Sequence, residues 1–319
     1  MFTCYECGVE YSYSNLLELD QVSNGFWCDY CDFFNPFKRE EIPNSLLVLE
    51  KKEIREKMPY KKPSIKLKKR LSPLRYPGGK SKMIDYLFSK IREIDNHLLI
   101  SPFIGGGSFE LSLLDAGVVT ELYMNDYDYG VYSFWDRVVH EPDNLIERIS
   151  EIPTKSDFYK GQREVLNGYK NCKGKDDAAY AFFTVNRLAY SGIPFANIMG
   201  GKDNPDPESH LARWNSESSI SKILYIHETL GEKIQVYNLD FSKLMQEYGA
   251  IRRGTIFLDP PYYVKGDELY VNKMTHTMHE QLALEVYLNR SNYALCDLLI
   301  TYDYHEEIES LYDFIPHEI

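Results

Sequence analysis

The tetrapeptide Asp259-Pro260-Pro261-Tyr262 holds the residue types most able to do chemistry. The apolar run 255–258 before it predicts a buried parallel strand, so Asp259 is expected at the carboxyl end of a strand, where open α/β sheets bind ligands. The two prolines fix φ and stiffen the turn. The Asp259 carboxylate and the Pro260 carbonyl can each accept one N–H while Tyr262 stacks on a ring. This arrangement suits a nucleobase with an exocyclic amine; the simpler alternative is a polar turn that ends a strand.

A second motif has the order strand, glycine turn, helix. The run 98–104 leads into Gly105-Gly106-Gly107-Ser108 and then into the apolar helical stretch 109–116. Glycines allow a sharp turn and the close approach of a ligand. A further strand is expected at 121–125, and Asp126, about 20 residues beyond the glycines, is placed to accept both ribose hydroxyls of a nucleoside. The loop is neither GxGxxG nor a P-loop, which argues against a nicotinamide or a triphosphate.

Length and composition fit a globular protein with one large α/β domain and a smaller unit. The chain has 319 residues, of which 44% are hydrophobic and 26% charged. No stretch approaches the roughly 20 apolar residues needed to cross a bilayer. The amino terminus lacks a basic and apolar leader. We therefore expect a cytoplasmic protein without membrane association.

Charge is distributed unevenly along the chain. The net charge is −12, but residues 51–82 contain 13 Lys and Arg against two acidic residues, which leaves the remainder at −23. A local basic arm can neutralise phosphates while the rest of the protein stays acidic. The alternative is a solvated linker. The candidate phosphate contacts are Lys66, Lys68, Lys69 and Arg70.

Four amino-terminal cysteines have the spacing of a metal site. Cys4 and Cys7 form one CxxC pair, and Cys28 and Cys31 form a second pair after 20 residues. Two such pairs supply four thiolates for a tetrahedral Zn²⁺ ion, and four thiolates leave no open position for catalysis. An intracellular chain disfavours disulfides. A structural zinc ribbon is therefore predicted, since a folded unit this small needs a metal ion or another cross-link to be stable.

The sequence predicts three successive regions. These are the zinc ribbon at 1–37, a basic linker at 38–70 and an α/β domain at 71–319. A helical and loop-rich insertion at about 127–215 interrupts the sheet. Further strands are expected at 234–237 and 294–302, and further helices at 82–94, 279–289 and 306–312.

Taken together, the motifs resemble the Dam-type (D12 class) DNA adenine-N6 methyltransferases from about Leu71 to Tyr312. Four blocks carry the resemblance: Arg75-Tyr76-Pro77-Gly78-Gly79-Lys80, Pro102-Phe103-Ile104-Gly105-Gly106-Gly107-Ser108, Asn125-Asp126 and Asp259-Pro260-Pro261-Tyr262. Their order, with the glycine loop first and the tetrapeptide late, is that of the α group of amino methyltransferases.

The resemblance implies a Rossmann-like sheet that binds S-adenosylmethionine and transfers its methyl group to adenine N6 in duplex DNA after base flipping. It implies a catalytic role for the four residues Asp259, Pro260, Pro261 and Tyr262. The implied cofactor contacts are Tyr76, Lys80, Phe103, Gly105, Gly107, Asp126, Asp240 and Asp259.

Residues 186–192 resemble the start of the family's target-recognition hairpin, which implies DNA contacts by Arg187, Tyr190 and Ser191. Members that read GATC carry a basic residue shortly after the hairpin glycine, whereas this chain has Ile193-Pro194-Phe195. This departure from the GATC-reading members leaves the target sequence open.

Alternative functions remain open at this point. An amino methyltransferase could act on cytosine N4 or on adenine in RNA, although Asp259 favours adenine because Ser is more usual in the cytosine enzymes. A non-catalytic DNA-binding protein could use the same fold, but an intact glycine loop, Asp126 and Asp259 argue against it. The expected partner is double-stranded DNA, and a restriction endonuclease as a second component is left open by the sequence. The resemblance implies the cytoplasm of a bacterial cell or of a phage-infected host.

Overall fold

A computed structural model describes most of the chain beyond its amino-terminal region. The described ranges are 65–76, 78–91, 98–202, 206, 208–248, 254–289 and 296–315, with strand segments at 2–3, 10–11, 21–22, 25–27 and 34–36. Cys4, Cys7, Cys28 and Cys31 lie outside these ranges, so the zinc ribbon stays a prediction. The amino-terminal strands form two small antiparallel sheets: β1 (Phe2–Thr3) with β2 (Glu10–Tyr11), and β3 (Gln21–Val22) with β4 (Gly25–Trp27) and β5 (Phe34–Pro36).

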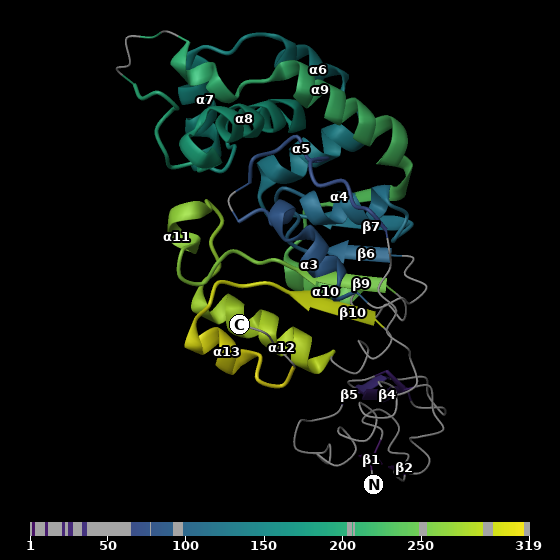
Figure 1. The fold of residues 1–319 in the computed structure, drawn as a ribbon. Coiled ribbons are helices and arrows are strands. Elements are labelled where there is room, and N and C mark those ends of the chain that lie inside the picture. Colours follow the sequence, from purple (N-terminus) through teal and green to yellow (C-terminus); the bar gives the residue numbers. More distant parts are fainter. Residues whose placement is uncertain are drawn as a thin grey trace.

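The centre of the molecule is a parallel sheet of five strands in the order β10-β9-β6-β7-β8 (Figure 1). The strands are β6 (Leu98–Ser101), β7 (Glu121–Asn125), β8 (Ile234–Tyr237), β9 (Gly254–Leu258) and β10 (Cys296–Ile300). The chain builds outward from β6 in one direction and then from β9 in the other. The carboxyl ends of β6 and β9 therefore flank the point where the strand order reverses, which is where such sheets bind ligands. The predicted α/β class is confirmed.

Both faces of the sheet are covered, which explains why the two central strands, β6 and β9, are largely apolar and buried. Side chains alternate between the faces: Leu99 and Phe257 join one core cluster, whereas Ile100 and Ile256 join the other. The first cluster includes residues of α3 (Ile84–Phe88), α4 (Ser108–Asp115) and the helical lobe. The second includes residues of α10 (Phe241–Tyr248), α12 (His276–Leu288) and α13 (Glu306–Leu311).

A helical lobe lies above the sheet in Figure 1. Its helices are α5 (Tyr129–His140), α6 (Asp143–Ser150), α7 (Lys155–Leu166), α8 (Lys175–Leu188) and α9 (Ser216–Tyr225). Helix α8 packs against α5 and α7, and at Gly161 of α7 an added Cβ would stand 3.2 Å from the Ala181 carbonyl. The lobe occupies the predicted insertion and extends it, because α9 and a π-helical turn at Ile226–Leu230 continue the helical path toward β8.

Element boundaries differ from the sequence expectation where the chain turns toward the sheet edge. The strand expected at 98–104 ends at Ser101, because Ile104 N–H donates to the Asn125 carbonyl (2.8 Å) and the loop crosses the end of β7. The helix expected at 82–94 is shorter, since a 3₁₀ turn at Lys80–Lys82 precedes α3.

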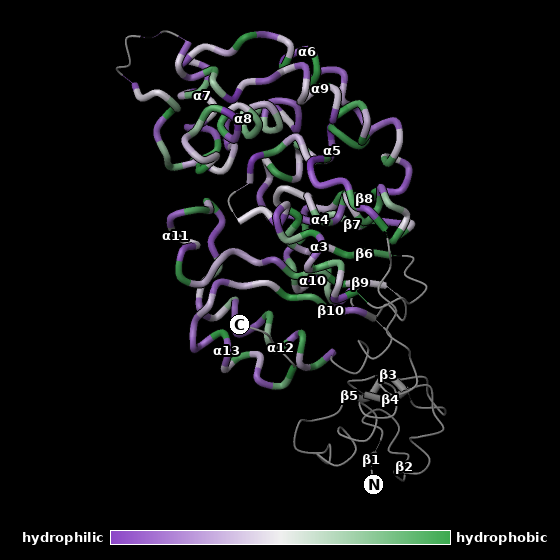
Figure 2. Tube along the Cα trace, viewed as in Figure 1, coloured by the Kyte–Doolittle hydropathy of each residue, from purple (hydrophilic) through white to green (hydrophobic). Residues whose placement is uncertain are grey.

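Figure 2 shows hydrophobic residues concentrated along the central strands and the inner helices, with hydrophilic residues toward the outside of the lobe. Within the described ranges, no helix combines the length and the apolar character that crossing a membrane requires. In the same ranges, no group of three or more His, Cys, Asp or Glu side chains is placed to hold a metal ion.

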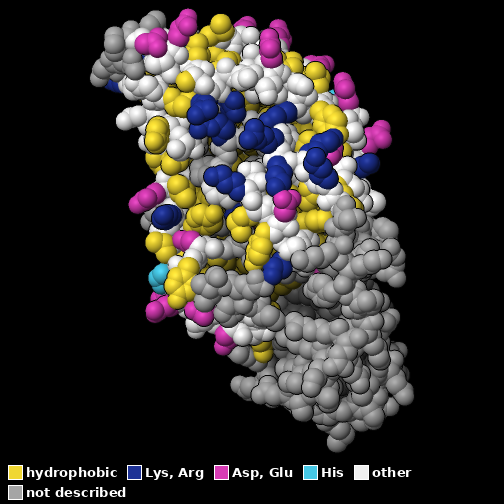
Figure 3. All heavy atoms as spheres, in the orientation of Figure 1, with side chains coloured by type: hydrophobic (Ala, Val, Ile, Leu, Met, Phe, Trp, Pro, Cys, Tyr) yellow, Lys and Arg dark blue, Asp and Glu magenta, His cyan; other side chains and the backbone are white. Residues whose placement is uncertain are grey.

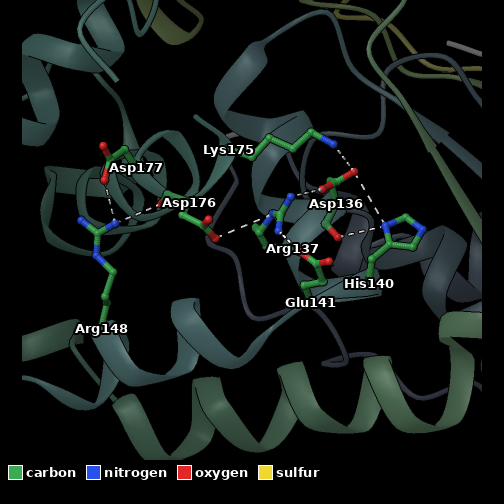
Figure 4. A network of polar contacts seen from close by, with 8 residues as sticks. All are labelled: Asp136, Arg137, His140, Glu141, Arg148, Lys175, Asp176 and Asp177. Carbon is green, nitrogen blue, oxygen red and sulfur yellow. Dashed lines mark hydrogen bonds and ion pairs between the residues drawn. The ribbon is translucent and has the colours of Figure 1, made fainter. Parts of the chain in front are cut away.

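A network of charged side chains ties the lobe together (Figure 4). Asp136 of α5 is only 7% exposed and accepts from Lys175 Nζ at the start of α8 (2.7 Å), while Arg137 lies 3.2 Å from the same carboxylate. Arg148 of α6 pairs with Asp177 of α8 at 3.2 Å. These pairs link α5 and α6 to the first turn of α8.

We predict that Asp136→Ala destabilises the protein by about 2 kcal/mol, because Lys175 and Arg137 would lose a buried partner. Denaturant unfolding followed by circular dichroism measures the change. Glu147→Ala is the matched control, since Glu147 is exposed on α6. Equal stability of the two variants would show that the network contributes nothing.

Candidate active site

An open cavity of about 980 Å³ lies at the carboxyl ends of β6 and β9, between the sheet and the helical lobe. Most of the predicted cofactor residues and part of the predicted tetrapeptide line it. The predicted residues brought together there are Tyr76, Lys80, Phe103, Gly105, Gly107, Asp126, Asp259 and Pro261. Its lining of apolar and aromatic side chains with a few polar groups is the kind that ligand pockets usually have.

The glycine loop forms one wall, and its glycines are required by close packing. Gly105 (φ 43°) and Gly107 (φ 60°) adopt the left-handed region. A Cβ added at Gly105 would stand 2.7 Å from the Tyr76 ring, so that ring lies directly against the loop backbone. Trp135 Nε1 donates to the Gly105 carbonyl (2.9 Å) from the other side. The loop is thus fixed between an aromatic ring and α5.

Asp126 joins this loop to the end of β7. Its Oδ2 accepts from Gly105 N–H (3.0 Å) and its Oδ1 from Asp128 N–H (2.9 Å). Burial raises the pKa of Asp126 to about 7, and the nearby Asp128 adds to the shift. Asp126 is not the cap of the next helix, because Asp128 accepts from Gly130 N–H (2.8 Å) at the start of α5. Sequence analysis missed Asp128, although an Asp just before a helix is a recognised cap signal.

The Asp259 carboxylate is held from two sides. Lys80 Nζ lies 2.5 Å from Oδ1 and 2.6 Å from Oδ2, and Thr301 Oγ1 donates to Oδ1 at 2.7 Å. Lys80 also donates to the Gly78 carbonyl (2.8 Å) and is only 7% exposed. Burial raises the pKa of Asp259, while Lys80 and Thr301 oppose that shift. Lys80 was predicted to contact a cofactor. In the structure it also holds the carboxylate of Asp259, the predicted catalytic residue.

Tyrosine rings surround this ion pair. Tyr262 has its hydroxyl 3.5 Å from Lys80 Nζ, and its ring lies 6.2 Å from that of Tyr270, edge to face. Tyr270 in turn lies 6.0 Å from Tyr76 and lines the cavity. Flat aromatic faces beside a carboxylate suit a planar base. Tyr270, which follows α11 (Gly266–Leu269), carried no sequence signal for this position.

Glu110 is a further acid that sequence analysis missed. It lies in the first turn of α4, is 3% exposed and lines the cavity, and Ser101 Oγ donates to its Oε1 at 2.9 Å. Burial raises the pKa of Glu110 to about 7; Asp259 adds to the shift and Lys80 opposes it. Among the described residues that line the cavity, the acids are Glu110, Asp126, Asp128 and Asp259, and Lys80 is the one base. The cavity thus favours a ligand with net positive charge.

Other predicted residues lie away from the cavity wall. Asp240 Oδ1 accepts from Ser242 N–H (2.9 Å) at the start of α10, and Asp240 is not part of the lining. Its role beside a cofactor stays a prediction. Among the predicted DNA contacts, Tyr190 is 67% exposed, and Ser191 adopts a left-handed φ of 57° at a 3₁₀ turn after α8. Arg187 is half-buried and donates to the Pro73 carbonyl (3.4 Å).

The predicted basic arm is partly neutralised by the protein itself. Lys68 pairs with Asp115 at 3.0 Å, and Lys69 pairs with Asp85. Lys66 and Arg70 are exposed and have no acidic partner among the described residues. These two keep their charge available for phosphate.

A doubly wound sheet, a glycine loop at its switch point and a proline-braced carboxylate on the neighbouring strand define a group-transfer enzyme that binds a nucleoside-containing cofactor. The family model for the "D12 class N6 adenine-specific DNA methyltransferase" matches residues 76–318. The chain belongs to this family. It is also similar to the Type II methyltransferase M.MjaIII of Methanocaldococcus jannaschii, with 22% identity over 202 residues, which cover 59% of this chain and 68% of that protein.

Family membership confirms the predicted activity: the protein is a DNA adenine-N6 methyltransferase that depends on S-adenosylmethionine. The family does not support the alternatives, which were methylation of cytosine N4, methylation of adenine in RNA, and a non-catalytic DNA-binding protein. The residues present fit this cofactor. The absence of a side chain at Gly105 lets the Tyr76 ring pack directly on the loop that lines the cavity, and Asp126 offers oxygens suited to ribose hydroxyls. The acidic wall complements a sulfonium, and Lys80 can pair with a carboxylate.

We predict that the protein binds S-adenosylmethionine more tightly as pH rises from 6 to 8. Asp126 and Glu110, each with a pKa of about 7, are neutral below that value and ionised above it, so the site gains negative charge that attracts a cationic ligand. Calorimetry should show Kd falling about tenfold. S-adenosylhomocysteine, which lacks the sulfonium charge, is the control and should change less. Identical pH profiles for the two ligands would contradict this account.

Proposed function

We propose that this enzyme extrudes one adenine from duplex DNA and holds its N6 amine against Asp259 and the Pro260 carbonyl during methyl transfer. The observation that carries the proposal is the Asp259 carboxylate, fixed by Lys80 and Thr301 at the mouth of an acidic cavity. Extrusion is needed because N6 is unreachable in a stacked duplex, and it costs a few kcal/mol.

Asp259 acts on a weak nucleophile. The lone pair of the adenine amine is shared with the ring, and hydrogen bonds from N6 to Asp259 and to the Pro260 carbonyl favour a tetrahedral nitrogen. S-adenosylmethionine supplies the electrophilic methyl group. Asp259 then stabilises the positive charge that develops on N6 and accepts a proton from it. Positioning and a preorganised polar site account for most of the rate in such a scheme.

Lys80 and the adenine amine share the Asp259 carboxylate. Lys80 contacts both oxygens of Asp259, and Thr301 contacts one of them. These contacts leave Oδ2 a lone pair for the N6 amine, since an ionised carboxylate accepts at about four sites. A cofactor carboxylate is a suitable further partner for Lys80. Tyr262, whose ring lies 5.4 Å from Lys80 Nζ, would stack on the extruded base.

A cluster of cations suits the DNA backbone. Its members come from four parts of the chain: Arg70, Arg75, Arg187, Arg213 and Lys222. Burial and mutual repulsion lower the pKa of Arg187 to about 10 and also lower the pKa values of Arg75 and Lys222. No acidic side chain pairs with any of the five within the described ranges. Positively charged side chains held close together without acidic partners favour the binding of a polyanion such as DNA.

This cluster borders the cavity. Arg75 and Arg187 are the chain neighbours of Tyr76 and Asn186, which both line it. Figure 3 shows Lys and Arg side chains gathered on the face viewed there, in the upper half of the molecule. Phosphates bound to this face would bring a duplex over the cavity mouth.

The zinc ribbon on Cys4, Cys7, Cys28 and Cys31, the linker at 38–70 and a cytoplasmic location belong to the same proposal. The name of the relative from M. jannaschii supports a modification role beside a restriction endonuclease.

We predict that Asp259→Ala lowers kcat at least about 100-fold while S-adenosylmethionine still binds, because the variant loses its contact to N6. Transfer of labelled methyl groups to DNA and calorimetry measure the two properties. Asp313→Ala, at an exposed acid, is the control. Activity retained by Asp259→Ala would overturn the mechanism.

We predict that the double variant Arg213→Ala/Lys222→Ala binds DNA more weakly and lowers the slope of log K against log salt by about 1 to 2. Fluorescence anisotropy at several salt concentrations gives the slope. The control, Lys68→Ala/Lys69→Ala, also removes two charges, but ones already paired with Asp115 and Asp85. If both pairs change the slope equally, the cluster is not the phosphate-binding face.

A further inference from the structure

The loop that follows α8 is a short hairpin at the cavity mouth. An antiparallel bridge joins Ala189 to Ile198, and Tyr190 N–H donates to the Asn197 carbonyl (2.9 Å). Gly192 and Pro194 of this hairpin line the cavity. The hairpin therefore stands beside the place where an extruded base would enter.

The hairpin is braced on both sides. Gly192 has a φ of 74°, and a Cβ added there would stand 2.5 Å from the Arg75 carbonyl oxygen, so the turn is pressed against the opening segment of the domain. On the other side, Gln162 Nε2 of α7 donates to the Pro194 carbonyl (2.8 Å) and to the Ala196 carbonyl (2.9 Å). A loop held at these points can keep a side chain in a fixed position against a base edge.

The exposed side chains of the hairpin are uncharged. Residues 189–198 contain no acidic or basic residue. Tyr190 is 67% exposed and Phe195 is 49% exposed. Two large aromatic side chains on one braced loop, next to a cation cluster that includes Arg75 and Arg187, fit a surface that meets the bases while its neighbours meet the phosphates.

The chemistry of the hairpin selects among base pairs. In the major groove, guanine is read chiefly by the forked donors of Arg or by Lys, and residues 189–198 offer neither. An apolar side chain such as Phe contacts the 5-methyl group of thymine instead. Phe195 adjoins Pro194, which lines the cavity, so its partner base lies close to the target adenine.

We infer that Phe195 is a specificity residue that recognises the methyl group of a thymine near the target adenine. The inference rests on the proposed DNA-binding face. The enzyme accordingly distinguishes thymine from uracil in duplex DNA at that position, although the two bases pair identically with adenine.

The test compares two long duplexes of identical mixed sequence, one amplified with dTTP and the other with dUTP. Adenine methylation by the wild-type enzyme should be about fivefold slower on the uracil duplex, because one buried methyl contact is lost. Phe195→Ala should be slower on the thymine duplex and show no difference between the two. Tyr190→Ala, at the other exposed aromatic residue, is the control and should keep the fivefold difference.

Two results would overturn the inference: equal wild-type rates on both duplexes, or an undiminished thymine preference in Phe195→Ala. Thermal unfolding and S-adenosylmethionine binding show that the variants are folded. Failure of the inference is separable from failure of the proposed function, because methylation of the thymine duplex at any rate shows that the enzyme is active on DNA.

Discussion

The ion pair between Lys80 and Asp259 is the constraint on which the site depends. It joins residues 179 positions apart and fixes the opening segment of the domain to the end of β9. Four acids line the same cavity, and without Lys80 their mutual repulsion in a site of low polarity would be uncompensated. The pair also sets the charge of the site, because Lys80 opposes the rise that burial causes in the pKa of Asp259.

The sheet could be predicted because its central strands are marked by runs of consecutive apolar residues in the sequence. A parallel strand covered on both faces must be apolar throughout, and β9, in which every residue is buried, reads that way in the sequence. The glycine loop, Asp126 and Asp259 could be placed for a related reason: each lies at or just beyond the carboxyl end of a strand of this sheet. Boundaries were less accurate. Strand β6 ends at Ser101 because Ile104 N–H in the following loop donates to the Asn125 carbonyl, a contact that the sequence does not specify.

The rest of the site depends on contacts between distant segments. Glu110 reads as part of an apolar helix, and only the approach of Lys80 and Asp259 gives it an electrostatic role. The basic arm was identified by counting charges, but a count does not reveal that Lys68 meets Asp115. Conversely, nothing in the sequence marks Arg213 and Lys222. They come near Arg187 only because the 3₁₀ turn Ser209–Arg213 packs against α8 and α9 follows it directly.

One pair of hydrogen bonds connects the end of α8, which leads into the hairpin, to the segment that packs on the glycine loop. The Asn186 side chain accepts from Arg75 N–H (2.9 Å) and donates to the Arg75 carbonyl (2.7 Å), and the next residue, Tyr76, presses on Gly105. A duplex of the wrong sequence that displaces the hairpin would therefore also displace Arg75, and with it the Tyr76 ring that packs on Gly105. Discrimination between sequences would then fall on the rate of methyl transfer as much as on affinity, and incorrect sites could be occupied without being modified.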